Sequence, residues 1–94
     1  MSQYYEAIIQ IRPGKKEILD FIKKQLETRK DIFVSRKVDL KTGSDIYISN
    51  QRFAKALGMQ LKKRFKGELK ITRSLYGKKD GRRIYRVTVL FRLN

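Results

Sequence analysis

The 94-residue sequence contains no cysteine, no histidine and no tryptophan, and it has a single proline. Without cysteine or histidine the chain has no disulfide, no zinc-finger ligand set, no thiol nucleophile and no histidine general base. Acidic residues are also scarce: nine Asp and Glu stand against 24 Lys and Arg, which gives a formal net charge of +15. Because like charges repel one another on so small a body, this excess points to an acidic partner.

Enough apolar residues remain for one folded domain. Hydrophobic residues make up 40% of the chain, and the length suits a single basic α+β domain over residues 1–94. No apolar run approaches the roughly 20 residues of a membrane helix, and the first residues do not resemble a signal peptide. We therefore expect a soluble, self-contained, cytoplasmic protein with no membrane partner.

Hydrophobic periodicity predicts seven elements in the order β-α-β-β-α-β-β. Alternating or β-branched segments predict strands at residues 4–12, 32–38, 46–48, 69–76 and 84–93. Apolar side chains at three- and four-residue spacing predict two helices. The first spans residues 15–29, and the second runs from a cap at Ser49 or Asn50 to about Lys66, before Gly67. Asp80-Gly81 predicts a tight turn between the last two strands.

The first six elements match the split βαβ, or ferredoxin-like, pattern, an antiparallel sheet with both helices on one face. The seventh, an extra C-terminal strand joined by a hairpin, is expected at the sheet edge. Its apolar side chains, however, are too many for a bare edge: Val87, Val89, Phe91 and Leu93 on one face and Leu90 on the other. Either this edge is covered or it pairs with another chain, for example in a homodimer.

Nothing in the sequence favours catalysis. The acids are scattered, and the one close pair, Glu17 and Asp20, lies among lysines in a pattern typical of solvated ion pairs. There is no phosphate-cradling glycine motif and no calcium loop. We expect no enzyme activity, no catalytic residue, no metal and no cofactor.

Two basic clusters are candidates for nucleic-acid binding. One face of the second helix carries cations with no intervening acid: Arg52, Lys55, Lys62, Lys63 and Lys66. The hairpin tip carries Lys78, Lys79, Arg82 and Arg83. Unrelieved like charge mildly destabilises a helix, which favours an anionic partner. The alternatives are a solvated helix face and a charged tip that keeps the turn soluble. An anionic membrane is a weaker rival, because the apolar side of the helix is needed for the core.

The sheet face turned away from the helices is a third candidate surface. If Ala7, Ile9 and Ile11 face the core, alternation places aromatic and basic side chains on the open side, and the candidates there are Arg12, Lys37, Tyr47, Lys70, Arg86 and Arg92. Such a face is how RNA-recognition sheets stack bases, although their signature aromatic motif is absent. Ordinary cross-strand packing is the alternative. Because phosphate contacts need cations and little else, these surfaces predict affinity for structured RNA or DNA without base specificity.

Two stretches, Tyr5–Arg12 and Gly81–Leu93, resemble the archaeal and eukaryotic ribosomal large-subunit export adaptor family, whose name derives from nonsense-mediated decay. Gly43–Ser49, the Ala54–Phe65 helix and Ser74–Gly77 resemble the same family in similar order. The resemblance implies binding to the large ribosomal subunit, with a role in its export or, in archaea, its maturation. Family members carry paired-cysteine zinc modules before this region. This chain has no cysteine, so zinc-dependent docking is not inferred for it.

Two hypotheses follow. The first is an RNA-binding domain that contacts ribosomal RNA, or the large ribosomal subunit, mainly through phosphates. The second is a protein-interaction module that dimerises, or pairs with a ribosomal protein, through its last strand.

Overall fold

The computed structural model describes residues 4–94, except for the side chain of Lys79. It contains the seven predicted elements in the predicted order, which confirms the α+β class. They are β1 (Ala7–Arg12), α1 (Lys16–Glu27), β2 (Val34–Leu40), β3 (Gly43–Ile48), α2 (Gln51–Arg64), β4 (Gly67–Lys79) and β5 (Arg82–Leu93). No helix among residues 4–94 is long and apolar enough to cross a membrane.

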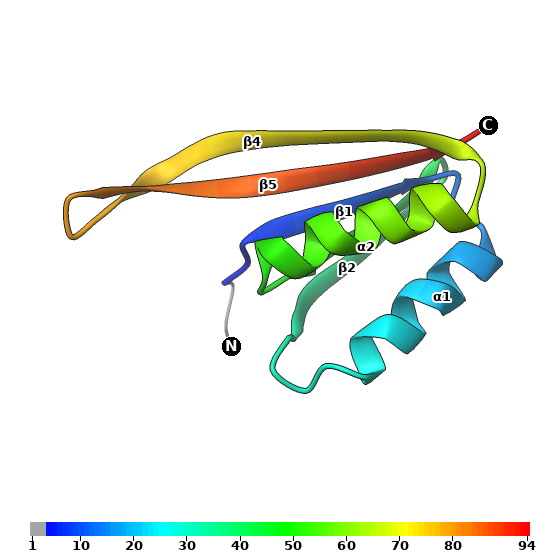
Figure 1. Cartoon of the computed structure of the whole chain (residues 1–94), viewed down its shortest axis with the longest axis horizontal. Helices are drawn as coiled ribbons and strands as arrows, with labels where there is room; N and C mark the ends of the chain where they lie inside the picture. Colours follow the sequence, from blue (N-terminus) through cyan, green and yellow to red (C-terminus); the bar gives the residue numbers. More distant parts are fainter. Residues whose placement is uncertain (1–3) are drawn as a thin grey trace.

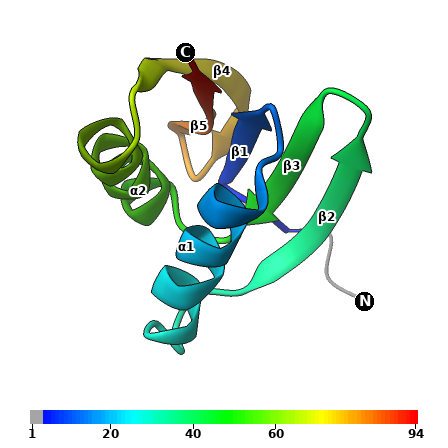
Figure 2. The same cartoon turned by 90° about the vertical axis from the view of Figure 1, so that its right-hand side faces the viewer.

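The five strands form one mixed sheet in the order β2-β3-β1-β5-β4 (Figures 1 and 2). β1 is antiparallel to β3 but parallel to β5. The prediction of an antiparallel sheet is therefore wrong, and so is the prediction that the last strand lies at the edge. β5 is inserted between β1 and β4, and β4 takes the edge.

Side-chain burial explains why β5 turns inward. Val87, Val89 and Phe91 of β5 are at most 1% exposed. The residue of β4 paired with Val87 is Arg73, whose side chain is exposed. The more apolar strand therefore takes the interior position, and the more charged strand faces solvent at the edge. From Val87 to Arg92, β5 pairs with β1 on one side and with β4 on the other, so this stretch has no free edge for a homodimer.

Both helices cover one face of the sheet (Figure 2). The strand residues predicted to face the core are confirmed there, with Ile9 and Ile11 of β1 fully buried. From α2, Ala54, Leu57 and Leu61 complete this core. The helix comes close to the sheet at Gly58, where a Cβ atom would lie 2.7 Å from Cγ1 of Val89.

The start of α2 is fixed by its cap. The side chain of Asn50 accepts a hydrogen bond from the Phe53 backbone N–H at 2.8 Å, which confirms one of the two predicted caps. The helix ends at Arg64, two residues before the predicted end, and the Phe65 N–H bonds to the Leu61 carbonyl.

The β4–β5 hairpin continues beyond the first residue of β1, Ala7, which pairs with Val87. Its outer part, residues 74–86, pairs only within itself and forms a two-stranded projection, which we call the arm (Figure 1). At its tip Asp80 and Gly81 have φ angles of 53° and 77°, as a two-residue turn of the predicted kind requires. The arm gives the molecule extents of 41 × 24 × 24 Å.

Candidate nucleic-acid interface

Charge is divided unequally between the two halves of the chain. Residues 51–94 carry 14 Lys and Arg against two acids, Glu68 and Asp80, whereas residues 1–50 carry ten against seven. The first set forms α2, β4 and β5, which pack against one another. A net charge of +12 is therefore concentrated on one side of a small fold.

Ion pairing increases this asymmetry. Among the described residues, all four ion pairs fall within residues 1–50, and they are Arg12–Asp45, Lys16–Asp20, Arg29–Asp31 and Lys37–Asp39. The hydrogen bonds from Arg29 lower the pKa of Asp31, which holds that carboxylate in its charged form. The cations of α2, β4 and β5 have no such carboxylate partners in the described part of the chain.

The outer face of α2 presents the first predicted cluster. Arg52, Lys55, Lys62 and Lys63 are all exposed, and Lys66 is exposed just beyond the helix. Arg64 is different, because its guanidinium lies 4.9 Å from the Phe21 ring centre and so packs toward α1. The first backbone N–H group of the helix is occupied, because the Gln51 N–H donates to the Glu6 carboxylate at 3.0 Å.

That same Glu6 carboxylate accepts a hydrogen bond from the Tyr4 hydroxyl. This bond, together with partial burial, raises the pKa of Tyr4 to about 12. The carboxylate is therefore occupied by the backbone of α2 and by the Tyr4 hydroxyl.

The arm presents the second predicted cluster. Lys78, Arg82 and Arg83 are exposed, while the Lys79 side chain lies outside the described residues. Arg82 and Arg83 line a hollow together with Arg73, and its lining also includes Asp80 of the turn and Gln51 at the start of α2. The Gln51 side chain also donates to the Tyr85 carbonyl at 3.3 Å. The hollow therefore lies between the arm and the start of α2, the end of the helix at which Arg52 of the first cluster lies.

Sequence reasoning missed Arg73. Alternation places Arg73 on the side of β4 that faces the core, and a residue on that side is not expected to belong to a binding surface. The helices do not extend under this part of β4, so Arg73 is exposed and its guanidinium lies 4.3 Å from the Tyr85 ring centre. We call the described cations of the two clusters, together with Arg73, the basic surface. It consists of Arg52, Lys55, Lys62, Lys63, Lys66, Arg73, Lys78, Arg82 and Arg83.

Two residues predicted on the open sheet face are used differently. Arg12 lies there, but its guanidinium pairs with Asp45 at 2.7 Å and donates to the carbonyls of Ser44 and Ile11. It is therefore held by contacts within the protein. Lys37 faces the helix side instead, paired with Ile46, because a β-bulge between Val34 and Arg36 shifts the alternation by one residue.

The other predicted residues do lie on the open face. Lys70 and Arg92 are exposed, and Arg92 stands opposite Glu68 in the register of β4 and β5 without an ion pair between these two described residues. Tyr47 and Arg86 are only partly exposed, because both pack against neighbouring rings. Among the described residues, no group of three or more acidic, histidine or cysteine side chains gathers as a metal site would require.

Together these features define a small basic α+β domain with a mixed sheet, a cationic helix face and a cationic arm. The family model described as NMD3, second domain, matches residues 4–93 of the chain. The chain therefore belongs to the NMD3 family, and the matched region has no cysteine for a zinc module. This confirms the resemblance found in the sequence and supports a ribosome-related role in large-subunit biogenesis. A comparison with curated proteins finds no match.

Proposed function

We propose that this chain is a non-catalytic, cytoplasmic RNA-binding domain that contacts ribosomal RNA of the large subunit through phosphate groups. The observation that carries the proposal is the net charge of +12 on α2, β4 and β5, without carboxylate partners among the described residues. Family membership supplies the ribosomal context. A surface on which cations far outnumber acids suits a polyanion, because phosphate contacts need positive charge and little else.

Side chains, rather than backbone amides, make the contacts. The N–H groups of Gln51 and Phe53 already donate to Glu6 and Asn50, which argues against the start of α2 as a phosphate site. The arginines of the hollow, Arg73, Arg82 and Arg83, offer planar donor groups that suit bidentate phosphate contacts. The lysines of α2 contact phosphates along the RNA backbone as point charges.

The salt dependence of binding measures this mechanism. About six phosphate contacts give a log–log slope of about −4 to −5, depending on whether the bound RNA is single- or double-stranded. We expect the chain to co-sediment with purified large ribosomal subunits in a salt series with a slope in this range. A flat salt dependence would overturn the phosphate mechanism.

A matched pair of variants locates the surface. K62E/K63E reverses two adjacent exposed lysines near the end of α2, and K23E/K24E does the same near the end of α1. Both variants change the net charge equally and place acids unfavourably near a helix C-terminus. We expect K62E/K63E to reduce the slope by about 2 and to weaken binding, with a much smaller effect of K23E/K24E. Equal losses in the two variants would reduce the interaction to general electrostatics.

The protein-interaction alternative now involves a different strand. The free sheet edge beside the basic surface belongs to β4, whose exposed apolar residues include Ile71 and Leu75. Lysines and arginines along β4 disfavour edge-to-edge pairing, which argues against this alternative. A dimer that persists at high salt, combined with unchanged RNA binding in K62E/K63E, would support it instead.

A further inference from the structure

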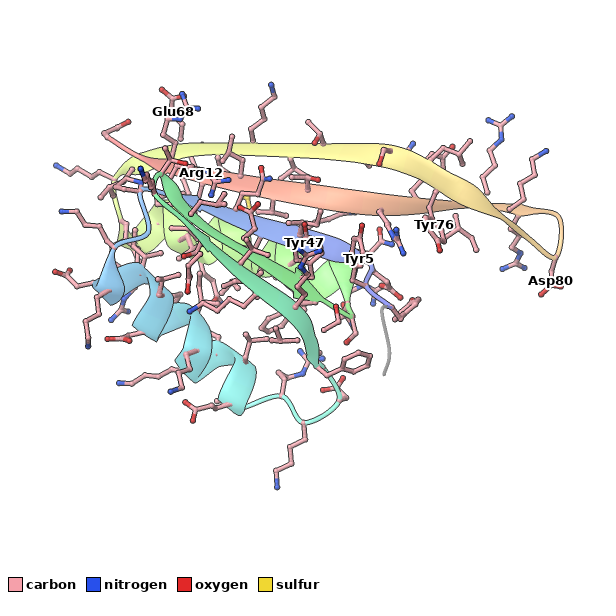
Figure 3. The ribbon with its side chains drawn as sticks, turned by 180° about the vertical axis from the view of Figure 1, so that it is seen from behind. Tyr5, Arg12, Tyr47, Glu68, Tyr76 and Asp80 are labelled. Carbon is pink, nitrogen blue, oxygen red and sulfur yellow. The ribbon has the colours of Figure 1, made fainter. Side chains whose placement is uncertain are left out.

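A row of stacked side chains crosses the open face of the sheet from one edge to the other. At β2 the Arg36 guanidinium lies 5.6 Å from the Tyr47 ring centre. The Tyr47 and Tyr5 rings meet edge to face with centroids 4.8 Å apart. The row then reaches β5 at Arg86 and β4 at Tyr76. Figure 3 shows Tyr47 and Tyr5 side by side, with Tyr76 further out along the arm.

Arg86 is the fixed centre of this row. Its guanidinium carbon lies 3.8 Å from the Tyr5 ring centre and 3.5 Å from the Tyr76 ring centre. Both distances are well within the range of a cation–π contact. Its Nε also donates to the Tyr5 carbonyl at 3.1 Å. The side chain is therefore held between two rings, and it supports Tyr76 from the side of the sheet.

Tyr76 ends the row with one ring face uncovered. Its exposed fraction is 59%, which is too large for a ring covered on both faces, and Arg86 covers only one. Tyr76 lies in the β-bulge between Leu75 and Gly77. Outside its two chain neighbours, a Cβ atom at the adjacent Gly77 would meet nothing within 4 Å, so no other part of the protein crowds the backbone at this bulge.

We propose that the outer face of Tyr76 is a stacking site for one unpaired nucleobase of the bound RNA. This inference rests on the proposed function and adds a base contact to it. A ring supported by a cation on its inner face is already in place, and every base has a flat face to stack on it. Thr72, Ser74 and Thr88 lie on the same sheet face, and their hydroxyl groups suit base edges and ribose hydroxyls.

The site belongs to unpaired RNA rather than to a helix. In a duplex the bases are stacked on one another, so a tyrosine at the surface has no base face to cover. The arm around Tyr76 carries Lys78, Arg82 and Arg83, and these cations hold the phosphates of the same strand nearby. An aromatic peptide is the other class of occupant, and the RNA measurements below distinguish it.

The test compares variants of the full chain on two RNAs, a short labelled oligouridine and a duplex of the same number of phosphates, by fluorescence anisotropy. We expect Tyr76→Ala to weaken oligouridine binding about tenfold or more, because base–aromatic stacking has that effect in other proteins. Its salt slope should stay unchanged, since the ring carries no charge, and duplex binding should stay unchanged as well. Tyr76→Phe should bind both RNAs like the parent chain.

Leu75→Ala is the matched control, because Leu75 is the neighbouring residue, is 56% exposed and pairs with Tyr85 rather than stacking on Arg86. It should leave both affinities unchanged. Tyr76→Leu keeps apolar bulk without a ring and should lose affinity like Tyr76→Ala, which covers the case in which the alanine variant unfolds.

Three results would overturn the stacking site: no loss in Tyr76→Ala, equal loss on both RNAs, or a loss in Tyr76→Leu that Tyr76→Phe shares. No loss is also what an aromatic peptide as the true occupant produces. These failures leave the phosphate mechanism intact, because it depends on the salt slope of the parent chain. A parent chain that binds neither RNA would overturn the proposed function and the stacking site together.

Discussion

Gly58 lies where α2 packs against β5, the strand that the sequence analysis placed at the sheet edge. A Cβ atom there would lie 2.7 Å from Cγ1 of Val89 and 3.0 Å from Cδ1 of Leu69. Carbon atoms normally pack at about 3.5–4.0 Å, so the contact with Val89 is short by roughly 1 Å. Val89 is fully buried in β5 and, as a β-branched residue, has little freedom to turn away. Leu69 is only partly buried, and its terminal methyl group can move.

Two opposing effects set the size of the change in Gly58→Ala. Overpacking a filled core costs about 1–3 kcal/mol. Replacing glycine by alanine within a helix gains about 1 kcal/mol. We therefore expect a net loss of about 0–2 kcal/mol in the free energy of unfolding. This range is too close to zero for the single variant to show whether residue 58 and Val89 are in close contact.

A double-mutant cycle with Val89→Ala removes this ambiguity. Without Cγ1 the clash disappears, so Gly58→Ala in that background should stabilise the fold by up to about 1 kcal/mol. The coupling energy between the two sites should be about 1–3 kcal/mol, measured by urea unfolding followed by circular dichroism. Gly77→Ala is the control, because no atom lies within 4 Å of its Cβ position and we expect no loss of stability.

The result that would refute the reasoning is a coupling energy near zero with Gly58→Ala stabilising in both backgrounds. In that case α2 would not rest on Val89, and β5 would not lie beneath it between β1 and β4.

Two further predictions concern the internal contacts of charged and phenolic groups. Arg12→Ala should lose about 1–3 kcal/mol of stability in urea unfolding, because it leaves the half-buried Asp45 carboxylate unpaired, whereas RNA affinity should not change. Arg92→Ala on the same face is the exposed control, and a larger loss there would contradict the assignment. The pKa of Tyr4 should be about 12 when measured by tyrosinate absorbance, and Glu6→Gln should return this pKa toward the ordinary tyrosine value of 10.0. Because folding raises this pKa, its contribution to stability is complete below pH 10 and is lost as pH rises toward 12; an unchanged titration in Glu6→Gln would contradict the role of Glu6.

Local signals in the sequence were sufficient for the seven elements, for the cap of α2 and for the last turn, whereas the predicted ends of the elements differ from the observed ones by a few residues. The Asn50 cap and the Asp80-Gly81 turn depend on residues close to one another in the chain, and both are confirmed. The apolar face of α2 was also predicted correctly, since helical periodicity is a local property. The cationic cluster on the other face of α2 followed from the same periodicity.

Pairing between distant strands was not available from such signals. A hairpin can dock with either of its strands inward, and burial of Val87, Val89 and Phe91 in the core beneath α2 decides the choice. A single bulge near Val34 turned Lys37 to the helix side and brought Arg36 to the open face, because side chains in a strand alternate with a period of two. Arg12 met Asp45 only through the pairing of β1 with β3.

The sequence by itself determined that this protein is a basic α+β domain of seven elements with two cationic clusters, because composition and periodicity are properties of the chain. Only the tertiary structure decided that Arg73 and the arm meet the start of α2 at a hollow, that the arm extends beyond the other strands, and that Tyr76 ends a stacked row. The physical reason is that these features arise from contacts between residues far apart in the chain, whose register depends on how the whole core packs.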